Sequence, residues 1–245
     1  KTIDLVVLDL DGTLLNSQHS ISALAKQTLQ RLSEKGIVIS VATGRGKIDV
    51  IKYVQWLELP QKSVPCIAYN GAFGMLLETV RYGVDNAPAA KPTTIFQHPL
   101  SAAETRRLLQ FAADNGLVTQ YYCSETGDVY AAPKNELQLK LVEKDGNLVG
   151  KPHNIVPNYE VVIEQMGPAS KLQIMTEDPD ALVVHAHREC LEKDFHIIKG
   201  SPDPFFVEFL PTNVNKGTAL KQLLKTPSLI ANCCTTAMEK KNIAK

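Results

Sequence analysis

Residues 3–15 read IDLVVLDLDGTLL, and this stretch decides the fold. The apolar run from Ile3 to Leu8 is typical of a buried strand, and Asp9 and Asp11 follow it one residue apart. Side chains alternate along an extended chain, so both carboxylates project to the same side. Because like charges buried together need a cation or a shared proton, we expect a divalent metal, a lysine or both close by.

The same layout suits covalent phosphoryl transfer. One ionised carboxylate can attack phosphorus, while a second, kept protonated, gives its proton to the departing oxygen. An Asp-x-Asp-Gly-Thr string can also be an ordinary acidic turn after a strand, so other motifs must decide between the two interpretations.

Composition favours a small-molecule enzyme. The 245 residues suffice for one large domain or two modest ones. Lys plus Arg number 26 and Asp plus Glu number 26, which excludes the strong basicity of a typical nucleic-acid or anionic-membrane binder. No apolar stretch approaches the ~20 residues that span a bilayer, and the first residues lack the pattern of a signal peptide. We therefore expect a cytoplasmic protein, with organellar targeting left open because the first residue is Lys1 rather than Met.

The five cysteines are an odd and scattered set without the paired spacing of a zinc site, so we expect reduced thiols. The six histidines likewise show no metal-ligand spacing.

The second motif follows a strand–helix–strand pattern. Apolar spacing predicts a helix over Ser22 to Lys35 that ends at Gly36, and a strand over Ile37 to Ala42. Thr43-Gly44-Arg45 comes at the end of this strand. Consecutive parallel strands usually neighbour one another, so this turn should open on the same edge of the sheet as Asp9.

A third apolar segment, Val64 to Tyr69, runs into Asn70-Gly71-Ala72, again a strand followed by a flexible turn. The sequence pattern changes after this segment. We expect an inserted domain over residues 75–198, with residues 1–74 and 199–245 forming the core. The predicted fold class is α/β, with a Rossmann-like three-layer α/β/α core around a parallel sheet and an inserted α+β domain.

Further elements are expected along the chain. Lys171 is interpreted as a charge on the surface of a half-buried strand. The expected set comprises a loop over Asp85 to Pro92, a helix with a capping box over Ser101 to Asn115, a hairpin around Glu125 to Asp128, a strand over Lys171 to Thr176, a helix from Asp178 to about Lys193, strands over Phe195 to Lys199 and Phe205 to Leu210, and a helix over Thr218 to Lys225.

Three motifs together resemble the haloacid dehalogenase superfamily of phosphatases, in its Cof-type branch with a large α/β cap. Asp9 to Thr13 fits the family's first motif, Val41 to Arg45 its second and Asn215 to Leu220 its third. The likeness extends to about Lys225, and the inserted domain has the size and position of the cap.

The resemblance implies a role for each matching residue. Asp9 would be the nucleophile that forms an aspartyl phosphate, and Asp11 the acid and later the base. Mg²⁺ would be held by the Asp9 carboxylate and the Asp11 backbone carbonyl. Thr43 and Gly44 would bind the phosphoryl group, which Lys216 would neutralise.

The resemblance further implies that Arg45, Asn70 and Gly71 face the substrate or the cap hinge. Two simpler interpretations stand beside these roles. Thr43 to Arg45 can be a plain turn, and Lys216 a surface lysine in the first turn of a helix, where a positive charge is mildly unfavourable.

The C-terminal part departs from the family pattern. The fourth motif, a Gly-Asp turn followed by Asn-Asp, should come after the next strand, yet no aspartate follows Asp203. Ser228 to Asn232 can form that strand, which puts Cys233 to Thr236 in the place of the acidic turn. Thiols and hydroxyls are poor ligands for a hard cation. A truncated or alternatively spliced product, a frame change after about Leu224 and a degenerate relative all remain open.

Two functions follow. The first is a Mg²⁺-dependent phosphomonoester hydrolase that acts on a small phosphorylated metabolite, with no nucleic-acid or membrane partner. The alternative is a catalytically impaired relative that binds phosphate ligands without efficient turnover. The sequence indicates no oligomeric state.

Overall fold

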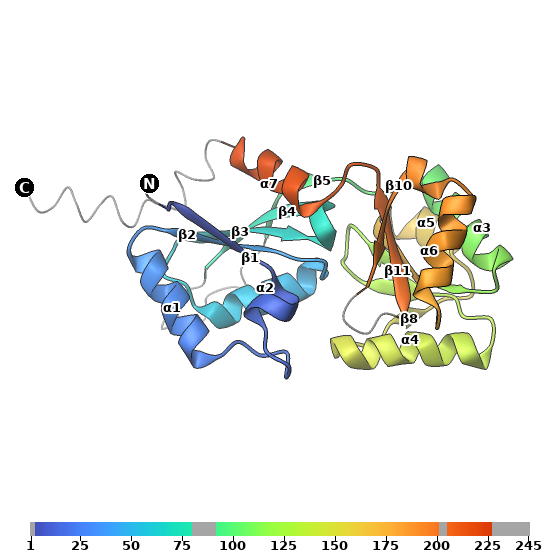
Figure 1. The fold of residues 1–245 in the computed structure, drawn as a ribbon, viewed down its shortest axis with the longest axis horizontal. Helices are drawn as coiled ribbons and strands as arrows, with labels where there is room; N and C mark the ends of the chain where they lie inside the picture. The colour runs from blue at the N-terminus through green and yellow to red at the C-terminus, as the bar shows by residue number, and fades with distance from the viewer. Residues whose placement is uncertain (1–2, 80–91, 201–204, 227–245) are drawn as a thin grey trace, which may run out of the picture. The chain divides into compact units, whose positions relative to one another are not determined.

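The computed structural model describes residues 3–79, 92–200 and 205–226 (Figure 1). The chain divides into two compact units, one built from the residues up to Gln97 and from Asn215 onward, the other from His98–Val214. Most of the loop expected over Asp85 to Pro92, the strand expected at Ser228 to Asn232, and the turn at Cys233 to Thr236 lie outside the described residues.

The first unit is built on one mixed sheet. Its strands lie in the order β1 (Leu5–Leu8), β2 (Val38–Ala42), β3 (Ser63–Ala68), β4 (Phe73–Glu78) and β5 (Thr93–Gln97). The pairs β1–β2 and β2–β3 are parallel as expected, whereas β4 and β5 add in antiparallel fashion. The carboxyl ends of the parallel strands therefore share one edge of the sheet, where Asp9, Thr43 and Tyr69 follow them.

Helices cover both faces of this sheet (Figure 1). Helices α1 (Ala23–Glu34) and α2 (Lys47–Leu57) lie on one face and α7 (Lys216–Leu224) on the other, which confirms the three-layer expectation. Ser22 caps α1 through its hydroxyl, which accepts the Ala25 N–H at 3.2 Å. Helix α2 was not predicted, and its first turn has Gly46 as N-cap with no side-chain hydrogen bond, so the sequence holds no start signal there.

The second unit is an α+β structure around another sheet. Its strands lie in the order β10 (Phe195–Lys199), β11 (Phe206–Pro211), β9 (Ala169–Met175), β6 (Val118–Cys123), β7 (Val129–Ala131) and β8 (Asn154–Ile155). All neighbours pair antiparallel except β7 and β8, and the β6–β7 hairpin is the one expected around Glu125 to Asp128.

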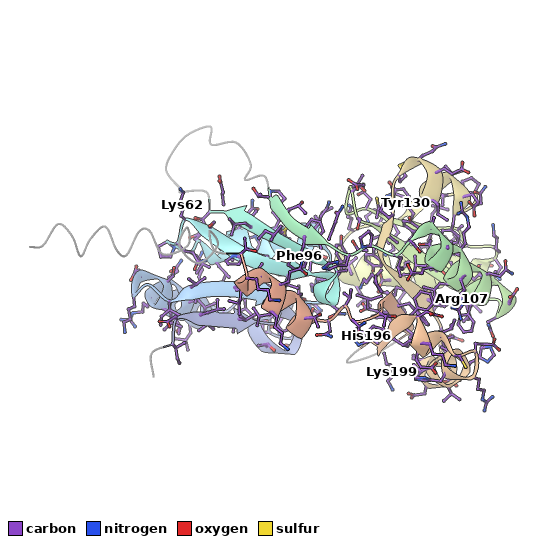
Figure 2. The ribbon with its side chains drawn as sticks, turned by 90° about the horizontal axis from the view of Figure 1, so that it is seen from above. Lys62, Phe96, Arg107, Tyr130, His196 and Lys199 are labelled. Carbon is purple, nitrogen blue, oxygen red and sulfur yellow. The ribbon has the colours of Figure 1, made fainter. Side chains whose placement is uncertain are left out.

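Alternate residues of this second sheet form two cores. Leu172, Tyr121 and Phe209 pack with helices α3 (Ala102–Asp114), α5 (Glu160–Gln165) and α6 (Pro179–Arg188). Residues of opposite parity, among them Val118 and Met175, pack with α4 (Glu136–Val149). The expected capping box at the start of α3 is present, and Figure 2 shows Arg107 on this helix.

The unit boundaries differ from the expected division at residues 75 and 198. β4 pairs with β3 along its whole length, and Phe96 of β5, labelled in Figure 2, packs on Gly74 of β4, so both strands belong to the first unit. Conversely, β11 pairs with β9 and β10 and belongs to the second unit. Strand pairing decides membership here, and local composition carries no information about it.

The interpretation of Lys171 as a surface charge is wrong. Because β9 is covered on both faces, its residues are all buried, and Lys171 is only 3% exposed. Its ammonium forms an ion pair with Glu208 of β11 and lies 4.5 Å from the centre of the Tyr122 ring. The polar–apolar alternation therefore marks two different environments on the two faces, and neither of them is solvent.

None of the helices among the described residues combines the length and apolar character that crossing a membrane requires.

Candidate active site

The paired aspartates lie at the carboxyl end of β1. The chain turns sharply over Leu10–Leu14, with Gly12 at a φ of +69°. Asp9 is fixed by this turn, because its Oδ1 accepts the Leu10 N–H at 2.7 Å and its carbonyl accepts the Leu14 N–H at 3.3 Å. One carboxylate oxygen of Asp9, Oδ1, is thus held in place by the backbone, which leaves Oδ2 for other partners.

A lysine from the far end of the chain meets Asp9. Lys216, the first residue of α7, places its Nζ 2.6 Å from Asp9 Oδ2. Both side chains are 36% exposed, so a ligand can reach the pair from solvent. This contact confirms the expectation that a cation lies beside the aspartates. The two residues are far apart in the sequence, so only the fold brings them together.

Asp11 has a different partner. The Arg45 guanidinium donates to both carboxylate oxygens, Nε to Oδ2 and Nη2 to Oδ1, each at 2.8 Å. Burial alone would raise the pKa of Asp11, but the hydrogen bond and charge of Arg45, with His19 and Lys216, hold it below the ordinary value of 3.8. Each aspartate therefore has its own cation in this arrangement, Lys216 for Asp9 and Arg45 for Asp11.

His19 was not expected at this site. Its Nδ1 lies 3.2 Å from Arg45 Nη2 and 3.7 Å from Asp11 Oδ1, and its carbonyl accepts the Tyr53 hydroxyl at 3.3 Å. Arg45 also lies over the Tyr53 ring, 5.3 Å from its centre. No spacing motif points to His19, so only the tertiary structure reveals it.

The second motif forms a loop that is bound to the turn after β3. Thr43 is almost fully buried, at 1% exposure, and its Oγ1 accepts the Arg45 N–H at 3.2 Å. The Asn70 N–H donates to the Thr43 carbonyl at 2.9 Å, and the Tyr69 N–H donates to the Arg45 carbonyl at the same distance. A Cβ atom on Gly44 would lie 2.9 Å from the Asn70 side-chain amide, so only glycine fits there without displacing Asn70.

The donor set suits a hard cation only in part. Among the described residues, no group of three or more His, Cys, Asp or Glu side chains is placed to hold a metal ion. Mg²⁺ nevertheless needs few protein ligands, because it keeps several waters and often takes one or two carboxylates together with substrate phosphate. The Asp9 carboxylate and the Asp11 backbone are compatible with such a site.

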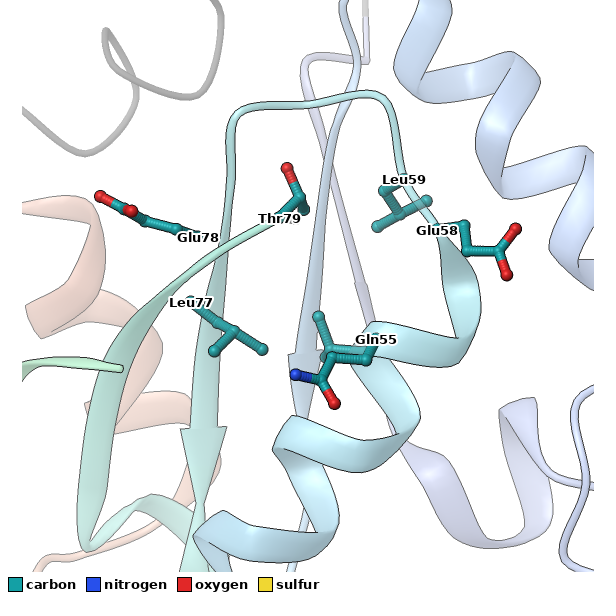
Figure 3. A pocket seen from close by; sticks show the side chains of 7 residues that line it. Gln55, Glu58, Leu59, Leu77, Glu78 and Thr79 are labelled. Carbon is teal, nitrogen blue, oxygen red and sulfur yellow. The ribbon is translucent and has the colours of Figure 1, made fainter. Parts of the chain in front are cut away.

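A cavity of about 230 Å³ lies elsewhere in the first unit (Figure 3). It is lined by Val54, Gln55, Glu58, Leu59, Leu77, Glu78 and Thr79. Glu78 pairs with Ser63 at the start of β3, whereas Asp9 follows the end of β1, so the cavity is at the opposite edge of the sheet from the aspartates. It contributes nothing to the candidate site.

This fold and site define an α/β protein with paired carboxylates at the end of a parallel strand. The chain belongs to the haloacid dehalogenase-like hydrolases, since the model of that family matches residues 6–232. A Streptococcus pyogenes relative is 27% identical over 227 residues, covering 91% of this chain and 76% of the relative.

Two further similarities are limited, one in the length that it covers and the other in sequence identity. One 5-amino-6-(5-phospho-D-ribitylamino)uracil phosphatase of Bacillus subtilis is 41% identical over 69 residues, 28% of this chain and 24% of that enzyme. The crystal structure of a haloacid dehalogenase-like hydrolase from Bacteroides thetaiotaomicron aligns with a TM-score of 0.72 at 22% identity, covering 93% of this chain and 78% of that one. At that identity the structural likeness supports the fold alone.

Proposed function

We propose that this hydrolase is a Mg²⁺-dependent phosphomonoesterase that acts on a small phosphorylated metabolite through an aspartyl-phosphate intermediate. The observation that carries the proposal is the 2.6 Å contact between Lys216 Nζ and Asp9 Oδ2, with Asp11 two residues further along. A carboxylate beside an ammonium suits attack on a phosphoryl group, because the cation offsets the charge on the phosphoryl oxygens.

The proposed reaction has two steps. Asp9 Oδ attacks phosphorus and forms a new P–O bond, while the bond to the leaving oxygen breaks and that oxygen takes a proton from Asp11. Asp11, now ionised, accepts a proton from water, which attacks phosphorus and releases inorganic phosphate from Asp9.

Arg45 controls whether Asp11 can serve as the acid. Because its guanidinium occupies both oxygens of Asp11 and holds its pKa below the ordinary value, this ion pair must open and Asp11 must take up a proton from solvent before it can protonate a leaving group. A phosphorylated substrate offers Arg45 another anionic partner, which agrees with its predicted role in substrate binding.

The remaining predicted roles fit the same reaction. Thr43, Gly44 and Lys216 would bind the phosphoryl oxygens. Asp9 and the Asp11 carbonyl would hold Mg²⁺, which when bound supplies a positive charge that orients the phosphoryl group. The second unit would act as a cap that excludes bulk water and selects the leaving group. The neutral charge balance gives no electrostatic reason for a nucleic-acid or membrane partner, and the proposed location is the cytoplasm.

One observation favours the second function, a phosphate-binding protein without efficient turnover. No aspartate follows Asp203 in the sequence, so this chain carries no acidic fourth motif. Fewer metal carboxylates would weaken transition-state stabilisation by a few kcal/mol, on the order of a hundredfold or more in rate.

A phosphatase assay separates the two functions. Hydrolysis of p-nitrophenyl phosphate with Mg²⁺ should be detectable for the wild type and vanish in Asp9→Asn. The matched control is Asp4→Asn, the same change at an exposed position just before the same strand, β1, which should keep wild-type turnover. Equal background rates in all three proteins, with inorganic phosphate still bound, would instead support the binding protein.

A further inference from the structure

The turn that follows β3 has an unusual backbone. Tyr69 and Asn70 both have a φ of +51°, and Gly71 has a φ of +117°. Successive residues in the left-handed backbone conformation are unfavourable unless they are glycine, so the surrounding structure must hold this turn in place. On one side it is held by its two hydrogen bonds to the carbonyls of Thr43 and Arg45.

On its other side the turn packs against the start of α7. A Cβ atom on Gly71 would lie 2.5 Å from the carbonyl oxygen of Asn215 and 2.6 Å from the carbonyl carbon. These are backbone atoms, so a larger residue cannot be accommodated by turning a side chain away. Any substitution at Gly71 must move either the turn or Asn215.

Asn215 cannot move independently of the helix. It is the N-cap of α7, where its Oδ1 accepts the Thr218 N–H at 2.9 Å and its own N–H donates to Thr218 Oγ1 at 3.1 Å. Lys216 is the next residue, and its ammonium makes the 2.6 Å contact with Asp9. A displacement of Asn215 therefore also displaces the backbone of Lys216.

We infer that Gly71 is a positioning residue that sets the place of Lys216 relative to Asp9 and to the Thr43–Arg45 loop. This inference rests on the proposed function. It gives Gly71 a positioning role in place of the direct substrate contact that the resemblance implied. The turn touches two elements that would both bind phosphate, and only the absence of a side chain at Gly71 lets them approach.

The test is a double-mutant cycle between Gly71→Ala and Lys216→Met, with kcat and KM measured on p-nitrophenyl phosphate. A misplacement near 1 Å can cost about a hundredfold, so Gly71→Ala should lower kcat about 10- to 100-fold with KM changed less than about threefold. In the Lys216→Met background the same change should have less than about a threefold effect, because the lysine is already gone. The same loss in both backgrounds, or an unchanged kcat, overturns the inference.

A matched control separates positioning from backbone strain. Gly116 also has a positive φ, +65°, but a Cβ atom there would meet nothing within 4 Å. Gly116→Ala should therefore keep the wild-type kcat. A loss equal to that of Gly71→Ala would show that strain alone explains the effect.

Two further measurements cover the cases in which the cycle cannot be read. The first applies if Gly71→Ala does not fold. Thr218→Ala removes the hydroxyl that accepts the Asn215 N–H, and it should lower kcat when Lys216 is present but not in the Lys216→Met background. An unchanged kcat in the presence of Lys216 overturns the inference. If the wild type has no turnover, the proposed function fails, and a crystal structure of Gly71→Ala still decides. Separation of Lys216 Nζ from Asp9 Oδ2 beyond roughly 3.5 Å supports positioning, and a retained contact refutes it.

Discussion

Replacing Lys216 by methionine should remove most of the activity and leave the fold intact. Methionine keeps much of the length of the side chain but loses the ammonium 2.6 Å from Asp9. Loss of one fixed charge at a reacting phosphoryl group costs about 3 kcal/mol, or roughly 150-fold in kcat/KM.

The cost to stability should be much smaller. Both partners are 36% exposed, and ion pairs in such positions contribute about 0–1 kcal/mol to folding. For a chain of this size, that corresponds to a fall in Tm of no more than roughly 2–4 °C.

The assay is steady-state hydrolysis of p-nitrophenyl phosphate together with thermal unfolding of the same samples. Lys221→Met is the matched control, because Lys221 is an exposed lysine near the other end of α7. Less than a tenfold loss for Lys216→Met, or an equal loss for the control, would refute the reasoning that the ammonium acts on the phosphoryl group.

Two other changes test the charges described above. Arg45 lowers the folded-state pKa of Asp11, so this pair contributes stability above the unfolded pKa and loses it as the pH falls through the folded value. Arg45→Gln should therefore destabilise the protein by up to about 1 kcal/mol at pH 7, and the gap from wild type in urea unfolding should begin to narrow below about pH 4 and close as the pH falls further. Lys171→Met leaves Glu208 buried without its ion-pair partner and should cost about 3–5 kcal/mol in urea unfolding, whereas adding Glu208→Leu should restore much of the loss. A single variant as stable as wild type would contradict the importance of this pair.

Much of the first unit could be predicted because its signals are local. An apolar run followed by Asp9 and Asp11 specifies a strand with charges at its end, and Ser22 at a helix start is a direct chemical signal for a cap. Parallel order then brings the ends of β1 and β2 to one edge, so the neighbourhood of the aspartates and Thr43 followed from topology rules alone.

Other features depend on contacts between segments that are far apart in the sequence, which a local sequence pattern does not reveal. Helix α2 exposes Ile48 and Trp56, at 41% and 44%, which blurs its amphipathic pattern. β11 joined the second unit because its hydrogen-bonding partner is β9, and Lys171 became buried because β9 is covered on both faces.

By itself the sequence determined the α/β class, the carboxylate pair, the expectation of a cation near it and the residues that match the family's first three motifs. Only the tertiary structure decided which cation meets which acid. It assigned Lys216 to Asp9 and Arg45 to Asp11, brought His19 to the same cluster and closed Gly71 against Asn215. The reason is physical: local signals set backbone conformation over a few residues, whereas the pairing of charges depends on distances that exist only after the chain has packed.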